Sequence, residues 1–266
     1  MIWSIGNTTV RNPNRIRDAL IAYDKEGIIP GLYKKSDTKS QILLFECLQK
    51  FDVIDSDEDN DDDKAFFGRK WRLSFKEMGL VSDGRTSNYL PGEITKTGRH
   101  LINCVTESQI QNIFFRILFN LEYRKKGWQK KISQTFKPLS LLIKVLHRLN
   151  LEHSNSVIDK DEFALIIQDY REGKAIESYV SEIYNFRSQK SLHKGKIKEF
   201  ISDRYKLSSI NNGLKVSTIK GDYPDCTFRL LKLSGLFVSR GRGIEFNSQY
   251  SKAPIIDLNS SSEEAF

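Results

Sequence analysis

Apolar residues recur at helical spacing along most of this chain, and the pattern changes character near its C-terminal end. Residues 226–246 begin as an amphipathic helix, stop at a glycine and continue as a short hairpin. Gly241 and Gly243 permit the positive φ angles that a tight hairpin turn requires. Arg240 and Arg242 would then project from the hairpin tip toward a phosphate or a groove. This order is how a winged helix ends, although a generic helix–hairpin with solvated arginines fits the same residues.

The same order occurs earlier in the chain. Apolar positions predict helices over 33–51 and 65–78, and a glycine ends the second of them. Residues 82–88 lie between two apolar pairs and are predicted to form a second wing loop. The motif Gly79-Leu-Val81 therefore matches Gly235-Leu-Phe237, which indicates a duplicated architecture.

Further helices complete the pattern, and they are predicted over 107–123, 138–151, 158–167 and 175–187. At the start of the third, Asp159 stands three residues before Glu162, close to the arrangement of a capping box. The sequence therefore predicts a mainly α fold with small β-hairpins (α+β). We expect two winged-helix-like subdomains in tandem, at 1–130 and 131–250, with 251–266 as a tail or linker.

Charge is distributed in blocks. The 266-residue chain has a net charge of +8 and a pI of about 9.2. Residues 124–148 hold eight Lys/Arg and no acid, and residues 181–242 hold thirteen Lys/Arg against five acids. Basic surfaces on two lobes favour a polyanion such as double-stranded DNA as the partner. The acidic run at 55–63 lacks the Gly and the closing Glu of a calcium-binding loop, so a solvated, mobile loop is expected.

The cysteine pattern and the hydropathy of the chain narrow the class of protein, because they argue against a zinc site and a membrane span. The three cysteines form no CxxC or Cys/His pattern, so a zinc site is not expected. Cys47 and Cys104 sit in apolar runs, which fits buried thiols in a reducing cytosol. No signal peptide is visible, and no apolar stretch approaches the ~20 residues that span a bilayer. We therefore expect a cytoplasmic protein with no membrane partner.

Four groups of motifs, in order along nearly the whole chain, carry a resemblance to a known family. The first two are Trp3-Ser-Ile with Thr9-Val-Arg-Asn-Pro-Asn-Arg15-Ile, and Arg69 and Lys76-x-x-Gly79-Leu-Val with Ile94-Thr-x-x-Gly98-x-x-Leu101. The last two are Asp161-Glu-Phe-Ala-Leu165 with Ile183-x-x-Phe186-Arg187, and residues 228–241. Together they resemble the N-terminal region of the AlwI/MlyI family of type IIS restriction endonucleases and their nicking relatives.

The resemblance implies a DNA-recognition module of two winged-helix-like subdomains that reads a short asymmetric duplex sequence. Two unlike lobes have no twofold symmetry, so we expect a monomer on the site. The resemblance also implies a separate C-terminal nuclease domain of PD-(D/E)xK type, which cuts outside the site with Mg²⁺. The chain stops where that domain would begin, so an isolated recognition domain without a cofactor of its own is expected.

No catalytic or metal-binding residues are predicted in this chain. A PD-(D/E)xK centre needs an Asp at a strand end and, on the adjacent strand, an acid two residues before a Lys. Pro224-Asp225 is followed by a helical pattern instead. The segments Glu122-Tyr-Arg124, Glu172-Gly-Lys174 and Asp24-Lys-Glu26 each lack a partner. The four histidines are scattered, and surface or core roles are expected for them.

Candidate DNA contacts follow from side-chain chemistry, because Asn and Arg suit base edges and Lys suits phosphates. In the first lobe they are Arg11, Asn12, Arg15, Arg69, Lys70, Arg72 and Lys76, with Arg85, Thr86 and Asn88 on its wing. In the second lobe they are Arg187, Lys190, Lys194 and Lys196, assigned to phosphates, with Arg229, Lys232, Arg240 and Arg242. Trp128 fits a core or inter-lobe anchor better than a base-stacking residue.

Three alternatives stay open. A stand-alone tandem winged-helix protein, such as a replication initiator or transcription regulator, would dimerise and prefer repeated or palindromic sites. A nuclease complete in itself would cleave DNA with Mg²⁺, although no residues for it are visible. A protein-interaction module would show little salt-dependent affinity for DNA.

Overall fold

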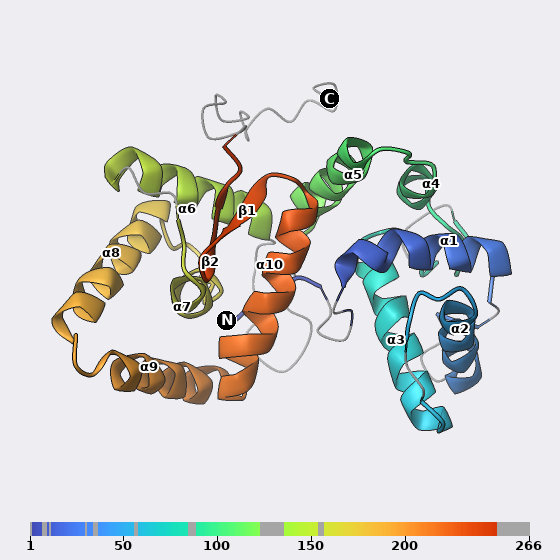
Figure 1. Cartoon of the computed structure of the whole chain (residues 1–266), viewed down its shortest axis with the longest axis horizontal. Coiled ribbons are helices and arrows are strands. Elements are labelled where there is room, and N and C mark those ends of the chain that lie inside the picture. Colours follow the sequence, from blue (N-terminus) through green and yellow to red (C-terminus); the bar gives the residue numbers. More distant parts are fainter. Residues whose placement is uncertain are drawn as a thin grey trace. The chain divides into compact units, whose positions relative to one another are not determined.

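A computed structural model describes residues 2–6, 10, 12–29, 31–33, 37–55, 58–84, 89–122, 136–153 and 157–248. These residues are mainly helical, with one two-stranded antiparallel hairpin, so the predicted α+β class is confirmed (Figure 1). Several sequence predictions fall outside the described residues, namely those for Arg11, Arg85, Thr86, Asn88, Trp128 and the tail at 251–266.

The chain divides into two compact units. One is Ile5–Leu118, and the other combines Met1–Ser4 with Phe119–Phe266. The sequence-based boundary at residue 130 lies outside the described residues, twelve positions beyond this division. The two units are called the N-unit and the C-unit below, and each is described by itself.

The N-unit consists of helices and one pair of bridged residues. Its elements are η1 (Pro13–Arg15), α1 (Ile16–Glu26), α2 (Thr38–Lys50), α3 (Asp61–Glu77), α4 (Lys96–Ile102) and α5 (Glu107–Asn120), which runs across the boundary. Val81 and Ile94 form an antiparallel bridge between α3 and α4. Helices α2 and α3 approach so closely that a Cβ at Gly68 would lie 1.9 Å from the Gln41 carbonyl oxygen.

The acidic run is not wholly a loop, which corrects the prediction for 55–63. Asn60 caps α3 by accepting a hydrogen bond from the Asp63 N–H at 2.8 Å, and three aspartates form the first helical turn. Carboxylates are favourable there because they lie beside the partial positive charge of the helix N-terminus. The preceding helix α2 begins at Thr38, not at residue 33, with Asp37 as its cap.

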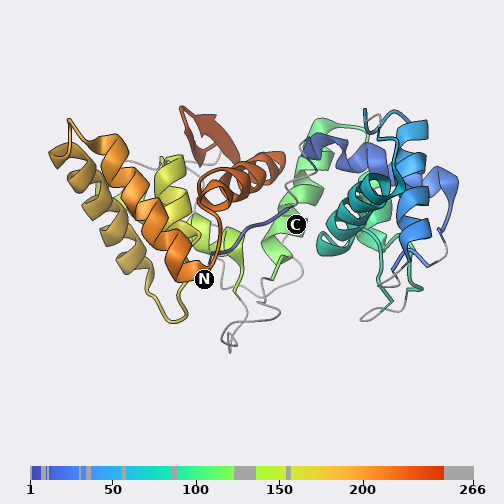
Figure 2. The same ribbon diagram turned by 90° about the horizontal axis from the view of Figure 1, so that it is seen from below.

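The C-unit holds the larger set of elements. They are α6 (Pro138–His153), α7 (Lys160–Glu162), π-helical η2 (Phe163–Ile167), α8 (Ile176–Leu192), α9 (Ile197–Asn212), π-helical η3 (Thr218–Asp222), α10 (Tyr223–Leu233), β1 (Phe237–Arg240) and β2 (Gly243–Phe246). The hairpin follows α10 directly in both views (Figures 1 and 2). Ile158 forms an isolated antiparallel bridge with Ile244, so the backbone at Ile158 borders the hairpin.

The N-terminal segment belongs to the C-unit, and Trp3 holds it there. Its indole N–H donates to the Ile167 carbonyl at 2.8 Å, and the side chain is fully buried against Phe136 and Phe163. Gln168 binds the Trp3 backbone twice, since its carbonyl accepts the Trp3 N–H at 2.9 Å and its amide donates to the Trp3 carbonyl at 2.8 Å. The family-like motif at Trp3 is therefore a packing element.

Candidate nucleic-acid interface

The hairpin β1–β2 presents two arginines at its tip. Arg240 pairs with Gly243 in the strand register, which leaves Gly241 and Arg242 as the two-residue turn. Gly241 has a φ of +56°, a value that residues with a Cβ rarely adopt. Arg242 is exposed, and Arg240 is 70% exposed with its Nε 3.9 Å from a Glu245 oxygen. The tip thus has the geometry that the sequence predicted.

Gly243 serves a different purpose from the one predicted. It does not adopt a positive φ, so the turn does not require it for backbone freedom. A Cβ at this position would lie 2.1 Å from the carbonyl oxygen of Ile158. Gly243 is therefore needed because the backbone around Ile158 approaches β2 closely.

Helix α10 carries basic residues on one side. Arg229 and Lys232 are exposed, whereas Phe228, Leu230 and Leu231 on the other side are buried. The start of the helix is tied to α7 by an ion pair of 2.6 Å between Lys160 and Asp225. The end is tied to the hairpin, because Lys232 Nζ donates to Ser239 Oγ at 3.2 Å.

The equivalent face of α3 is also basic. Arg69 is exposed, and its guanidinium carbon lies 5.5 Å from the centre of the Phe66 ring. Lys70 Nζ lies 5.1 Å from the centre of the same ring, which is itself 39% exposed. Cation–π contacts of this kind hold long basic side chains in place on a surface.

Arg72 and Lys76, on the same helix, have partners within the N-unit. Arg72 donates to the Leu32 carbonyl at 3.0 Å, and among the described residues its buried Nε has no hydrogen-bond partner. Burial lowers the pKa of Arg72, which nevertheless stays charged. Lys76 Nζ lies 2.7 Å from a carboxylate oxygen of Asp83, beyond the end of the helix.

The opening residues have local roles in the N-unit. The Asn12 side chain accepts a hydrogen bond from the Asn14 N–H at 3.2 Å and caps η1. Arg15 donates to the backbone carbonyl of Asp52. Asn12 thus does start a helix, and its contact with DNA stays a prediction.

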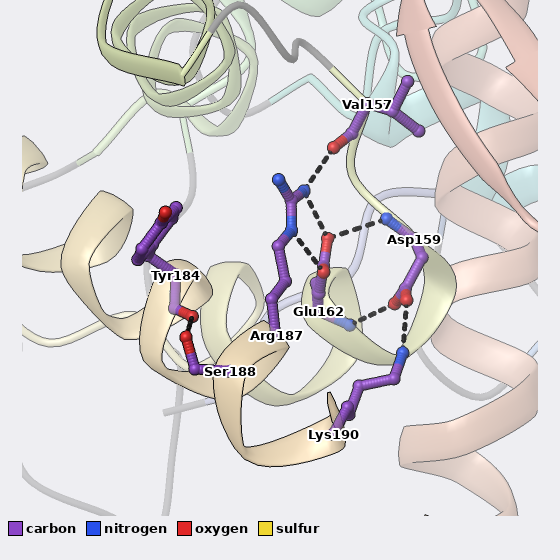
Figure 3. A network of polar contacts seen from close by, with 7 residues as sticks. All are labelled: Val157, Asp159, Glu162, Tyr184, Arg187, Ser188 and Lys190. Carbon is purple, nitrogen blue, oxygen red and sulfur yellow. Dashed lines mark hydrogen bonds and ion pairs between the residues drawn. The ribbon is translucent and has the colours of Figure 1, made fainter. Parts of the chain in front are cut away.

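Arg187 and Lys190 join α8 to α7 in a network of charges (Figure 3). Arg187 binds Glu162 through two parallel hydrogen bonds of 2.7 and 2.9 Å and also donates to the Val157 carbonyl at 2.6 Å. Lys190 Nζ lies 2.7 Å from Asp159. The hydrogen bond to Glu162 raises the pKa of Arg187 above its usual value.

The network also contains the predicted capping box. The Glu162 N–H donates to the Asp159 side chain at 2.8 Å, and the Asp159 N–H donates to the Glu162 carboxylate at 3.0 Å. Glu162 is only 3% exposed, and its carboxylate is paired with Arg187, whose side chain is 24% exposed. By contrast, Lys194 and Lys196 are exposed in the turn between α8 and α9.

Sequence reasoning missed α9 and the role of Asp161. The α9 residue Tyr205 donates from its hydroxyl to an Asp161 oxygen at 2.8 Å, and both side chains are buried. Tyr205 packs with Ala164 and Ile219. Burial raises the pKa of Tyr205. Helix α9 buries only Tyr205, and its other apolar residues, such as Phe200 and Ile201, are at least partly exposed among polar residues. Its amphipathic pattern is therefore weak, and the sequence did not predict the helix.

The two units share a structural motif that we call the corner. In the N-unit it starts at Gly79, which follows α3 with a φ of +64°, and continues through Leu80 to the bridged residue Val81. The Thr95 N–H donates to the Leu80 carbonyl at 3.0 Å, and the Thr95 hydroxyl donates to the Gly79 carbonyl at 2.6 Å. One residue thus closes the motif with both its backbone and its side chain.

The C-unit repeats these contacts. Gly235 follows α10 with a φ of +70°, and Leu236 leads into β1. The Asn247 N–H donates to the Leu236 carbonyl at 2.9 Å, and its side-chain amide donates to the Gly235 carbonyl at 3.0 Å. The predicted match between the two glycine motifs therefore extends to the hydrogen bonds around them.

The acids that were considered for catalysis have structural partners. Asp24 pairs with Arg99, Asp225 with Lys160, and Glu26 with Lys50. Within the described ranges, no group of three or more His, Cys, Asp or Glu side chains could hold a metal ion. Over the same ranges, no helix has the length and apolar character needed to cross a membrane.

Comparison with protein families identifies the class of protein. A sequence profile of the AlwI restriction endonuclease matches residues 76–259, which is more than half of the chain. The chain therefore belongs to the AlwI restriction endonuclease family, and membership of this family implies binding to DNA. A search of curated proteins finds no match. The matched range includes both corners and the network around Arg187, whereas the opening residues and Arg69 precede it.

Proposed function

We propose that this chain is the sequence-specific, double-stranded DNA recognition part of a type IIS restriction endonuclease. The observation that carries the proposal is the corner, because each unit presents a helix with a basic face followed at once by bridged backbone, the β1–β2 hairpin in the C-unit and the Val81–Ile94 bridge in the N-unit. In a winged helix the corresponding helix enters the major groove, and the wing reaches the backbone or the minor groove.

In the C-unit, the element order supports a winged-helix-like module with an insertion. Helix α6, Ile158, α7 with η2, α10 and the hairpin follow one another as the helices and strands of such a module do. The isolated bridge between Ile158 and Ile244 stands where such a module has its third strand. Helices α8 and α9 are then inserted before α10, which we assign as the recognition helix.

In the N-unit, the order α1, α2, α3 and the Val81–Ile94 bridge supports a second module, with α3 as its recognition helix. The two modules differ in their insertions and in their exposed side chains. A chain with two unlike modules has no twofold axis, and we propose that it binds a short asymmetric site as a monomer.

The proposed direct contacts are candidates whose side chains lie at the surface, either exposed or, at Lys70 and Lys76, partly exposed. Arg229 would read bases, since it lies on the solvent side of α10 and Arg suits guanine edges. The hairpin arginines and the turn lysines would bind phosphates. The proposed contacts are Arg69, Lys70, Lys76, Lys194, Lys196, Arg229, Lys232, Arg240 and Arg242. We assign cleavage to a separate PD-(D/E)xK domain that uses Mg²⁺.

Binding-site selection from random duplex DNA, at moderate salt and without metal, tests the proposal. We expect enrichment of one short asymmetric sequence. Arg229→Ala should then relax the preference at one or two base pairs, whereas Arg242→Ala should weaken binding to all sequences alike and reduce its salt dependence.

Other outcomes would contradict the proposal in distinct ways. Enrichment of a palindrome or a repeat would point to a dimeric regulator or initiator. Binding without salt dependence or enrichment would point to a protein-interaction module. Cleavage of the selected site by this chain with Mg²⁺ would overturn the assignment of catalysis to a separate domain.

A further inference from the structure

The repeat of the corner places one lysine identically in both units. Lys76 stands three residues before Gly79, and Lys232 stands three residues before Gly235. Each lysine occupies the last turn of its helix and reaches the residue four positions beyond the glycine. In both units, therefore, a lysine bridges the end of the recognition helix and the start of the wing.

The partners of the two lysines differ in charge. Lys76 Nζ lies 2.7 Å from a carboxylate oxygen of Asp83, and Asp83 is only 14% exposed. Lys232 Nζ lies 3.2 Å from the hydroxyl of Ser239, which is neutral. The positive charge at the C-unit corner is thus intact, while the one at the N-unit corner is paired with a carboxylate.

Other helix positions are not shared between the two units. Arg69 stands ten residues before its glycine, where the C-unit has Asp225, and Arg229 stands six residues before its glycine, where the N-unit has Leu73. In two modules that bind different parts of one duplex, shared cations suit the invariant phosphates, and unshared residues suit the bases.

We propose, on the basis of the proposed DNA-recognition function, that Lys76 and Lys232 are equivalent phosphate-binding residues of the two modules and that Asp83 weakens the first. The carboxylate of Asp83 competes with a DNA phosphate for Lys76 and repels the backbone. Ser239 positions Lys232 without neutralising it. The C-unit corner consequently binds the duplex backbone more strongly than the N-unit corner.

A reciprocal exchange of the two partners tests this assignment. Asp83→Ser should increase the affinity for duplex DNA about threefold near 0.1 M salt, and the slope of log K against log salt should steepen by about 0.9. Ser239→Asp should lower affinity and slope by similar amounts. Because the first variant gains binding, a general loss of folding cannot imitate its effect.

Charge-matched controls separate local from overall electrostatics. Glu26→Gln frees Lys50 from an exposed ion pair of 2.9 Å in the N-unit and changes the net charge as Asp83→Ser does. Ser178→Asp adds an exposed charge on α8, as Ser239→Asp does at the corner. Each control should change affinity less than its partner variant.

The outcomes distinguish this proposal from the function on which it rests. If the unmodified chain shows no salt-dependent duplex binding, the proposed function itself fails. If it binds but the two exchanges match their controls, the lysines only stabilise their helix ends and the corner assignment is overturned. If Lys76→Gln lowers affinity as much as Lys232→Gln does, the weakening role of Asp83 is wrong.

Discussion

At the residue scale, the chemistry of a side chain indicates a candidate DNA contact. Partners that are distant in sequence decide whether its charged group is exposed or paired within the protein. The exposed tip at Arg240 and Arg242 could be predicted because a hairpin turn is a local feature. Arg187 could not be assigned in this way, since its partner Glu162 lies twenty-five residues away in sequence. Arg187 and Lys190 on α8 both have acidic partners within the C-unit, and their contact with phosphates stays a prediction.

A single methyl group at Gly243 should destabilise the C-unit. The Cβ of Gly243→Ala would meet the Ile158 carbonyl oxygen at 2.1 Å, and backbone atoms must shift to accept it. We expect a loss of about 2–3 kcal/mol in the free energy of unfolding, measured by urea denaturation. Gly195→Ala is the matched control, because a Cβ there meets no atom within 4 Å. Equal midpoints for the two variants would show that the backbone at Ile158 can move away freely.

At the element scale, strong helical periodicity predicted most helices. The periodicity of α9 was too weak to predict it, and the acidic residues at the start of α3 led to the prediction of a loop. Helix α9 buries little besides Tyr205, so its apolar pattern is too sparse to recognise. The acidic segment suggested a loop, but Asp61, Asp62 and Asp63 form a helical first turn. The corner could be predicted because its glycine and leucine are adjacent in sequence, although its closure by Asn247 depends on the fold.

The ion pair between α7 and α8 should orient the C-unit rather than contact DNA. Arg187→Gln should lower the free energy of unfolding by about 3 kcal/mol, because it leaves the buried Glu162 carboxylate without its partner. Glu162→Gln should cost less, because Arg187 is 24% exposed and keeps its hydrogen bond to the Val157 carbonyl. The double variant should lose less than the sum of the two. Measured on folded protein, both single variants should weaken DNA binding without changing the salt slope.

If Arg187 contacts a phosphate directly, we expect the opposite effects on DNA binding and on the salt slope. Arg187→Gln would then reduce the salt slope by about 0.9, and Glu162→Gln would leave binding intact or strengthen it by releasing the guanidinium. Lys194→Gln is the comparison variant, since Lys194 is exposed in the turn after α8. Its substitution should reduce the slope without affecting stability.

At the scale of the whole molecule, two units share one chain, but they are not consecutive segments. Sequence periodicity predicted two lobes and could not show that residues 2–4 pack with the second, because the partners of Trp3 lie beyond residue 135. Tandem order is the simplest expectation for a duplicated pattern. The structure instead divides the chain so that one unit is interrupted by the other.

Removal of the Trp3 indole should therefore affect the C-unit, most of which is distant from Trp3 in sequence. Trp3→Ala should destabilise the C-unit by about 3–5 kcal/mol, since it removes a buried aromatic side chain. Hydrogen exchange should lose protection in α6, α8 and α10 and keep it in α1, α2 and α3. The reciprocal variant Trp71→Ala should have the converse effect. Simultaneous loss of protection in both units would show that they unfold as one cooperative body.

The interrupted C-unit also imposes an order on biosynthesis. Residues 2–4 find their partners late in synthesis, because Ile167 and Gln168 are made more than 160 residues after Trp3. Until then the nascent chain carries Trp3 without its buried environment, while Ile5–Leu118 can already complete its own core. An exposed apolar segment of this kind is a suitable substrate for chaperones that capture apolar peptides, and its late docking would complete the core of the C-unit.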